Sequence, residues 1–125
     1  MEKITIYGQV PAQKNSKQIA YNPRTRKPFI MTNSRVKEWQ MSASVDLLKA
    51  SFVAGPVEIN MKFWNIDARK RDVDNMITSI LDLLKNNGVI EDDNCFIVRK
   101  VSGEFAGVDK ANPRAEICVK AFDII

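Results

Sequence analysis

The chain of 125 residues contains no histidine and only two cysteines, Cys95 and Cys118. Without histidine it has no imidazole general base, no Ser-His-Asp triad and no Cys/His zinc site. The two cysteines are expected to be small buried hydrophobic residues rather than a disulfide, as in reduced cytosolic proteins. Any hydrolytic chemistry must therefore rest on carboxylates, lysines, hydroxyls or a bound metal ion.

Long apolar segments are also missing from the chain. No apolar run approaches the length needed to cross a bilayer. The first residues lack the apolar core of a signal peptide. We therefore expect a cytoplasmic protein with no membrane partner. The length corresponds to one domain, residues 1–125, which can bury a core without disulfides or metals.

Acidic residues are absent from positions 3–37, although the net charge of the whole chain is only +4. Basic residues gather in this stretch and again at positions 69–71. Segregated positive charge either suits a polyanion such as nucleic acid or forms a solvated basic surface. The basic residues expected to contact DNA are Lys14, Lys17, Arg24, Arg26, Lys27, Arg69, Lys70 and Arg71.

The spacing of apolar residues predicts an α+β domain, in which a mixed sheet packs against two main helices. Alternation over residues 57–64 is the clearest strand pattern, and Gly88 stands where a helix C′ glycine belongs. The predicted order is β-(hairpin)-α-β-α-β-β. It comprises strands at 3–7, 57–64, 95–105 and 115–123, a hairpin of 18–21 and 28–31, helices at 35–51 and 73–86, and a loop at 106–114.

Four aspartates flank the second predicted helix. Asp72 and Asp74 fall at the junction between a strand and this helix, and Asp92 and Asp93 precede the next strand. A helix of about 14 residues followed by a tight return is expected to bring the third carboxylate back near the first two. Three acidic side chains from two separated stretches would then share one pocket.

Carboxylates packed together repel one another. A pair about 4 Å apart costs on the order of 1 kcal/mol in water and about 4 kcal/mol at an effective dielectric near 20. A bound cation relieves that repulsion, and an all-oxygen site suits a hard ion such as Mg²⁺. Such an ion can activate water and stabilise charge on a phosphodiester. The alternative is structural: Asp72 caps the helix, Asp74 favours its positive end, and Asp92-Asp93-Asn94 forms a polar turn.

Residues 71–75 (Arg-Asp-Val-Asp-Asn), followed by residues 81–84, 88–90 and the pair Asp92-Asp93, resemble the RusA family of Holliday junction resolvases. Residues 11–15, with Lys14 and Asn15, resemble the early loop of the family and add Asn15 to the expected DNA contacts. The resemblance implies a homodimer that cuts four-way DNA junctions by paired nicks in recombination and repair. It also implies that Mg²⁺ is required and that Mn²⁺ substitutes for it.

Carried over by position, the resemblance makes Asp72, Asp74 and Asp93 the catalytic metal ligands, with Asp92 as a substitute for Asp93 or a support to it. Asn75 would order the site, and Asp82 either faces the same cavity or gives buried polar support. Thr78 stands where the family often has a lysine, so Lys70, Arg71 or Lys85 supplies the missing charge or activity is reduced.

Three other functions fit the same residues. A nuclease for flaps or replication forks would use the same metal site. A non-catalytic protein that binds branched DNA would fit the threonine at position 78. A structural α+β module would need no nucleic acid at all. Tyr21 and Phe29 either stack on unpaired bases at the crossover or anchor the basic loop.

Overall fold

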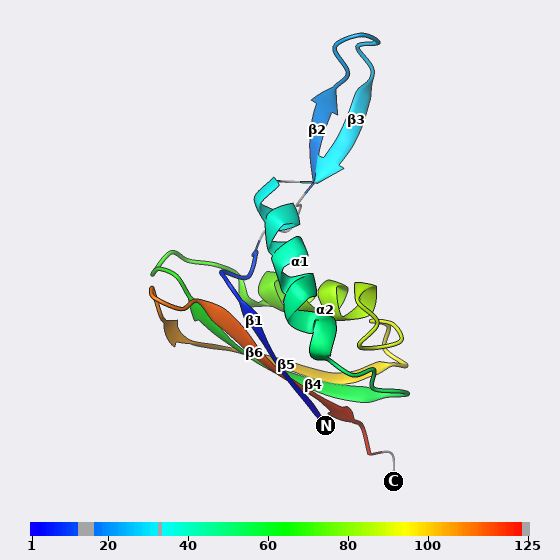
Figure 1. Cartoon of the computed structure of the whole chain (residues 1–125), viewed down its shortest axis with the longest axis vertical. Coiled ribbons are helices and arrows are strands. Elements are labelled where there is room, and N and C mark those ends of the chain that lie inside the picture. Colours follow the sequence, from blue (N-terminus) through cyan, green and yellow to red (C-terminus); the bar gives the residue numbers. More distant parts are fainter. Residues whose placement is uncertain (13–16, 33, 124–125) are drawn as a thin grey trace.

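The computed structural model describes residues 1–12, 17–32 and 34–123. It confirms a single α+β domain with a mixed four-stranded sheet and two main helices (Figure 1). Among the described residues, no helix combines the length and the apolar character needed to span a membrane. The elements are β1 (Glu2–Tyr7), β2 (Lys17–Tyr21), β3 (Pro28–Thr32), α1 (Ser34–Asp46), the short 3₁₀ helix η1 (Leu47–Lys49), β4 (Val57–Asn65), α2 (Val73–Asn86), β5 (Val98–Val108) and β6 (Arg114–Ala121).

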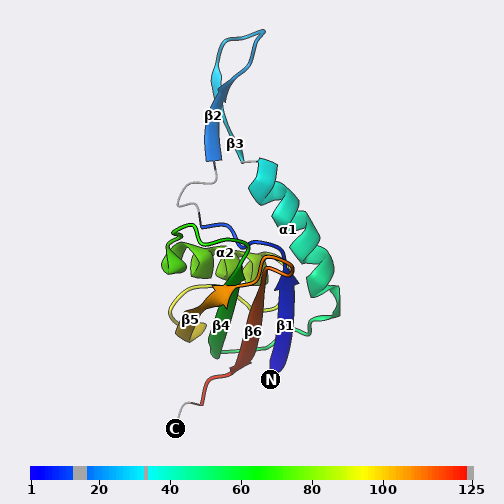
Figure 2. The ribbon, with the colours of Figure 1, turned by 90° about the vertical axis from the view of Figure 1, so that its left-hand side faces the viewer.

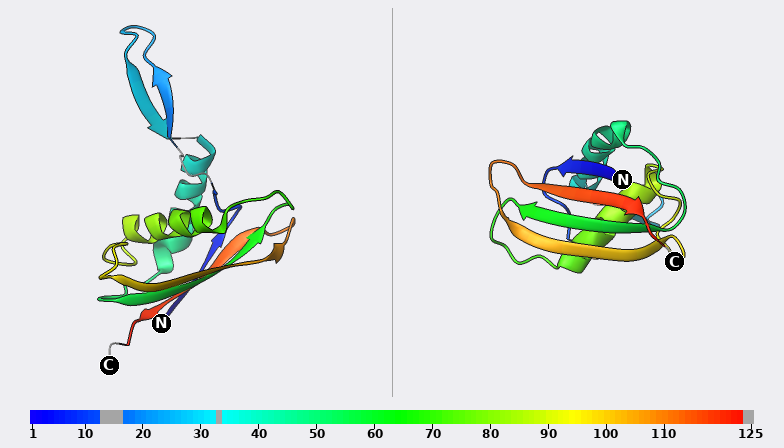
Figure 3. Two further views of the ribbon diagram at one scale, coloured as in Figure 1. Left: turned by 180° about the vertical axis from the view of Figure 1, so that it is seen from behind. Right: turned by 90° about the horizontal axis from the view of Figure 1, so that it is seen from below.

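The four-stranded sheet has the order β1-β6-β4-β5. β6 is antiparallel to both of its neighbours, whereas β4 and β5 are parallel. Parallel neighbours require a crossover connection, and α2 forms that crossover. Both helices lie on the same face of the sheet, α1 beside β1 and α2 beside β5 (Figure 3). The N-terminus of α2 therefore follows the carboxyl end of β4, and its C-terminus returns toward the start of β5.

Burial follows the predicted alternation along β4. Val57, Ile59, Met61 and Phe63 are buried in the core, together with one face of α2. The close approach of α2 to β5 depends on Gly103, because a Cβ atom there would lie 2.5 Å from Ile77 Cδ1. Gly103 thus lets Ile77 of α2 pack directly against the backbone of β5.

The second predicted helix is confirmed with its predicted bounds. Gly88 follows it with a φ of 71°, which glycine adopts without strain. The Val89 N–H donates to the Leu84 carbonyl (2.9 Å) and the Gly88 N–H to the Lys85 carbonyl (3.2 Å). These two bonds form a Schellman motif, so the predicted helix stop has the expected chemistry.

Three predicted element ends are wrong by more than two residues. The helix expected over 35–51 ends at Asp46, just before η1 begins at Leu47. The strand expected over 95–105 begins only at Val98, because the Asn94 side chain accepts hydrogen bonds from Phe96 N–H (2.9 Å) and Ile97 N–H (3.2 Å) and holds those residues in a turn. The strand then runs to Val108, three residues into the loop expected over 106–114. Both cysteines are free, as expected, but neither is buried: Cys95 lies in this turn and is exposed, and Cys118 in β6 is half-buried.

The predicted hairpin is confirmed as β2 and β3, which form a separate two-stranded sheet. It projects away from the domain beyond the first turn of α1 (Figures 1 and 2). Asn22 organises its tip: the side-chain oxygen accepts from Arg24 N–H (2.9 Å) and the backbone carbonyl from Arg26 N–H (2.7 Å). An ordered basic loop is thus held at the end of a projecting arm.

Candidate functional site

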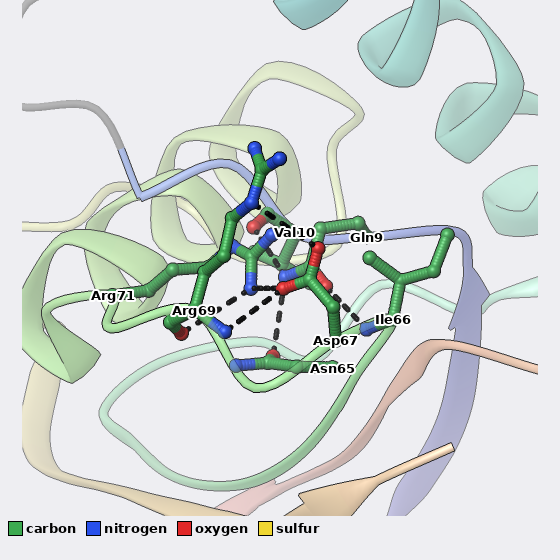
Figure 4. Close-up of polar contacts among 7 residues, drawn as sticks. All are labelled: Gln9, Val10, Asn65, Ile66, Asp67, Arg69 and Arg71. Atoms are coloured by element: carbon green, nitrogen blue, oxygen red, sulfur yellow. Dashed lines mark hydrogen bonds and ion pairs between the residues drawn. The ribbon is translucent and has the colours of Figure 1, made fainter. Parts of the chain in front are cut away.

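The loop between β4 and α2 is fixed at its start by Gln9 and Asn65. Asn65 is the one polar residue buried in the core among the described residues. The Gln9 side-chain amide donates to Asn65 Oδ1 (3.1 Å), and its oxygen accepts from the backbone N–H of Ile66 (2.7 Å) (Figure 4). The N-terminal segment therefore determines the direction in which the chain leaves β4.

Asp67 holds the next part of this loop. Its carboxylate accepts from the Arg71 guanidinium (2.7 Å) and from the backbone N–H of Arg69 (3.1 Å), as Figure 4 shows. The hydrogen bond from Arg71, followed by the one from Arg69, lowers the pKa of Asp67. Only 17% of the Arg71 side chain is exposed. One guanidinium is thus fixed in place directly before the first candidate aspartate.

Asp72 and Asp74 lie at the N-terminus of α2. Asp72 is the N-cap residue, yet its side chain makes no capping hydrogen bond. The Asn75 amide donates to its Oδ2 at 3.5 Å, and Asp74 accepts from the Asn75 backbone N–H at 2.9 Å. Both aspartates are exposed. The capping alternative therefore does not account for the Asp72 carboxylate, whose oxygens face solvent beside the positive end of the helix dipole.

The residues one and two turns further along α2 contribute differently. The Thr78 hydroxyl donates to the Asp74 backbone carbonyl (3.1 Å), so its proton is used within the helix and is not directed at a substrate. Ser79 donates to the Pro11 carbonyl (2.8 Å) and ties α2 to the N-terminal segment. Asp82 is half-buried.

Asp92 and Asp93 differ in what their carboxylates do. Asp92 accepts from Asp93 N–H (2.7 Å) and from the Asn94 amide (3.1 Å), and the bond from Asp93 lowers the pKa of Asp92. Its oxygens are thus occupied within the polar turn. Asp93 is exposed, and its carboxylate pairs with Lys85 Nζ at 3.7 Å. Asp93 is accordingly the more available ligand of the two.

The expected meeting of Asp93 with Asp72 and Asp74 does not occur within the chain. Of the residues described, no three His, Cys, Asp or Glu side chains form a group that could hold a metal ion. Lys85, the partner of Asp93, follows Asp74 by eleven residues on α2, a separation of about 16 Å at the rise of an α-helix. Because α2 spans the length of the sheet, the two acidic pairs lie at its opposite ends.

Two comparisons with known proteins bear on this arrangement. The family model described as "Endodeoxyribonuclease RusA" matches residues 8–120. The chain belongs to the RusA family. A relative from Aquifex aeolicus (strain VF5), named Crossover junction endodeoxyribonuclease RusA, is 31% identical over 98 residues, which cover 75% of each chain. As a member of the RusA family the chain is an endodeoxyribonuclease, and the match extends from the residue before Gln9 nearly to the end of β6.

The residues expected to contact DNA in this RusA-family chain fall into two described groups, and some lie outside the described residues. Lys14 and Asn15 lie outside the described residues, and the side chains of Lys17 and Phe29 are not described. Tyr21 is exposed at the base of the hairpin tip. The two described groups are the exposed tip residues Arg24, Arg26 and Lys27 and the loop residues Arg69, Lys70 and Arg71, of which only Arg71 is substantially covered.

Sequence patterns did not point to three residues that organise this RusA-family loop: Gln9, Asn65 and Asp67. Two of them bond across more than fifty positions of the chain, which no local pattern reveals. A signal was present for Asn65, because it occupies the next inward position after Val57, Ile59, Met61 and Phe63, where the alternation calls for an apolar side chain. A polar residue in that position marks a buried hydrogen bond.

Proposed function

We propose that this RusA-family endodeoxyribonuclease cuts four-way DNA junctions by paired nicks, with Mg²⁺ as cofactor and Mn²⁺ as a substitute, in recombination and repair. The name of the Aquifex relative supports the crossover junction as substrate. The observation that carries the proposal is the uncapped, exposed carboxylate of Asp72 beside Asp74 at the N-terminus of α2. A divalent ion bound there would supply a polarised water and charge neutralisation at the scissile phosphate.

The residues fit half of an oxygen-ligand metal site in one subunit. Asp72 and Asp74 offer carboxylate oxygens without histidine or sulfur, the donor set that Mg²⁺ prefers. Mg²⁺ usually keeps several waters and takes only one or two carboxylates from the protein. Asn75 orients the pair through its bonds to both aspartates. The third carboxylate, Asp93, must come from elsewhere.

A second copy of the chain can supply it. α2 runs antiparallel to β4 and β5, so Asp72 and Asp74 lie at the carboxyl ends of these strands and Asp93 at their amino ends. A two-fold axis across α2 exchanges these ends between subunits. Asp93 of each copy then approaches Asp72 and Asp74 of the other, and two equivalent sites result. Two such sites match the two strands that must be cut in a four-way junction.

The free edge of β5 suits such a pairing. Among the described strands, β5 has one neighbour in the sheet, β4. It exposes Val101 and Phe105, and Phe96 is exposed just before it. A long edge strand with exposed apolar side chains can pair with another chain. Antiparallel pairing of two β5 strands about Ser102 would set Lys100 of each copy opposite Glu104 of the other, which favours that register. We propose this edge as the homodimer interface.

The basic groups would bind the DNA backbone. The hairpin tip with Arg24, Arg26 and Lys27 projects from the domain (Figure 2), and a two-stranded ribbon has the dimensions of the DNA major groove. Arg69 and Lys70 would contact phosphates close to the aspartates, with Arg71 held by Asp67. In the absence of a lysine at position 78, the exposed Arg69 and Lys70 would supply the positive charge at the scissile phosphate.

The proposal is tested by junction cleavage in Mg²⁺ with the wild type, Asp74→Asn and, as a matched control, Asp123→Asn near the C-terminus. We expect the wild type and the control to nick opposing strands, and Asp74→Asn to bind the junction without cutting it. Equal cutting by Asp74→Asn would remove Asp74 from its role. Faster cutting of flaps or forks than of four-way junctions would assign a different substrate, and junction binding without any cutting would make the protein a binding protein.

A further inference from the structure

A cavity of about 600 Å³ lies between the first turn of α1 and the loop that joins β4 to α2. Its wall ends at Asp72, so it adjoins the candidate metal ligands. Buried apolar side chains, Val10, Val36 and Trp39, form part of the lining, together with the partly exposed Ile66. The charged part of the lining consists of Arg35, Arg69, Lys70, Arg71, Asp67 and Asp72.

The charged half and the apolar half of this lining favour different chemical groups on a ligand. Four cationic and two carboxylate side chains give the lining a net positive charge, which favours an anion although Asp67 already pairs with Arg69 and Arg71. The apolar half, which includes the Trp39 indole, favours a flat apolar group that it can cover. A bare phosphate would leave the apolar half uncovered, and an apolar peptide would bring no group that matches the net positive charge of the lining. A nucleotide carries both groups on one residue, and the cavity has the size range of small-molecule pockets.

Trp39 adds a polar feature to the apolar half. Its indole Nε1 is buried and has no hydrogen-bond partner in the part of the chain that the structure describes. Buried donors normally have partners. Because Nε1 is covered, a ligand in the cavity would contact the indole ring itself and not this nitrogen.

We propose that this cavity takes up one unstacked nucleotide of the DNA strand that is cut, next to the scissile phosphate. The inference rests on the proposed function, because it assigns that phosphate to the site at Asp72. The base packs against Trp39 and Ile66, and its phosphate contacts Arg69 and Lys70. Taking a base out of the stack is easiest where it has already lost a neighbour. The cavity therefore favours a branch point over continuous duplex.

Filling the cavity tests the proposal. In Ile66→Trp the larger side chain occupies the apolar half from its exposed side, and Leu48→Trp introduces the same residue at an exposed position beyond the other end of α1. We expect Ile66→Trp to cut a four-way junction at a single-turnover rate at least about tenfold lower than the wild type. Its junction affinity in EDTA should stay within about threefold, because the phosphate contacts remain. Leu48→Trp should match the wild type in both measurements.

A second measurement uses the unaltered protein. Junctions carry the fluorescent base 2-aminopurine at single positions, and wild-type protein is added in EDTA, so that the DNA is bound and not cut. We expect a fluorescence change from unstacking at the nucleotide that flanks the mapped cut and at no position three or more nucleotides away. Wild-type rates in Ile66→Trp, or no change at the flanking nucleotide, would overturn the proposal while junction cleavage stands. A wild type that cuts no junction would instead contradict the proposed function.

Discussion

Mixing two inactive variants should restore junction cutting if each active site draws on both subunits. The separation of about 16 Å along α2 between Asp74 and the partner of Asp93 is too large for one small ion to bridge. In a two-fold dimer, Asp74→Asn and Asp93→Asn therefore inactivate the same composite site from different subunits. A mixed dimer of these variants has one site that carries both substitutions and one site that carries neither.

The expected magnitude follows from this arrangement. If equal amounts of the two variants exchange subunits at random, half of the dimers are mixed, and each mixed dimer holds one intact site out of two. About a quarter of the wild-type number of active sites should thus return. Each mixed dimer can cut only one strand at a time, so the product should be nicked junctions rather than fully resolved duplexes.

The assay is junction cleavage in Mg²⁺ after the two variants have been mixed and allowed to exchange, with product analysed on native and denaturing gels. Asp74→Asn mixed with Asp72→Asn is the matched control: both substitutions fall in the same half of the site, so no mixed dimer regains an intact site. Activity near zero in both mixtures, from samples shown to contain mixed dimers, would refute a site shared between subunits and would require Asp93 to act within its own chain or not at all.

Two further predictions concern packing and charge around the site. Replacing Asp67 by Asn removes a carboxylate whose pKa is lowered in the folded state, first by the Arg71 hydrogen bond. The ionised carboxylate stabilises the fold fully above the usual pKa of aspartate, and this stabilisation is lost below about pH 4. In acid titrations followed by circular dichroism, the wild type should therefore lose stability more steeply than the variant, and parallel curves would contradict this. Gly103→Ala should lower the free energy of unfolding by about 1–3 kcal/mol in urea titrations, because the added Cβ meets Ile77; the double variant with Ile77→Val should recover part of the loss, and an unchanged single variant would show that α2 shifts freely.

The elements at the centre of the domain were predictable because their patterns are local. Alternation along residues 57–64 and the helical period over 73–86 reflect burial on one face, and both elements lie where the patterns placed them. The position of Asp72 and Asp74 at the start of α2 followed directly. Gly88 could be assigned to the helix stop because a positive φ strongly favours glycine.

The errors arose where a side chain or a distant segment decides the structure. Asn94 delays the start of β5 through its side-chain oxygen, although residues 95–97 have the apolar character of a strand. Gln9 and Asp67 shape the loop before α2 through contacts that no periodicity encodes. The sequence predicts Asp93 beside Asp74 only if the turn after the helix returns the chain to the start of that helix. A helix that spans the whole sheet carries its two ends apart instead.

The residues of the projecting hairpin are separate from the residues that stabilise the core of the domain. An isolated two-stranded ribbon adds little to the stability of a domain, and β2 and β3 belong to no sheet but their own. Changes in the length or charge of its tip therefore leave the folding of the core largely untouched. If the hairpin tip contacts DNA as proposed, its length and charge could change to suit a different DNA geometry without a change in the four-stranded domain.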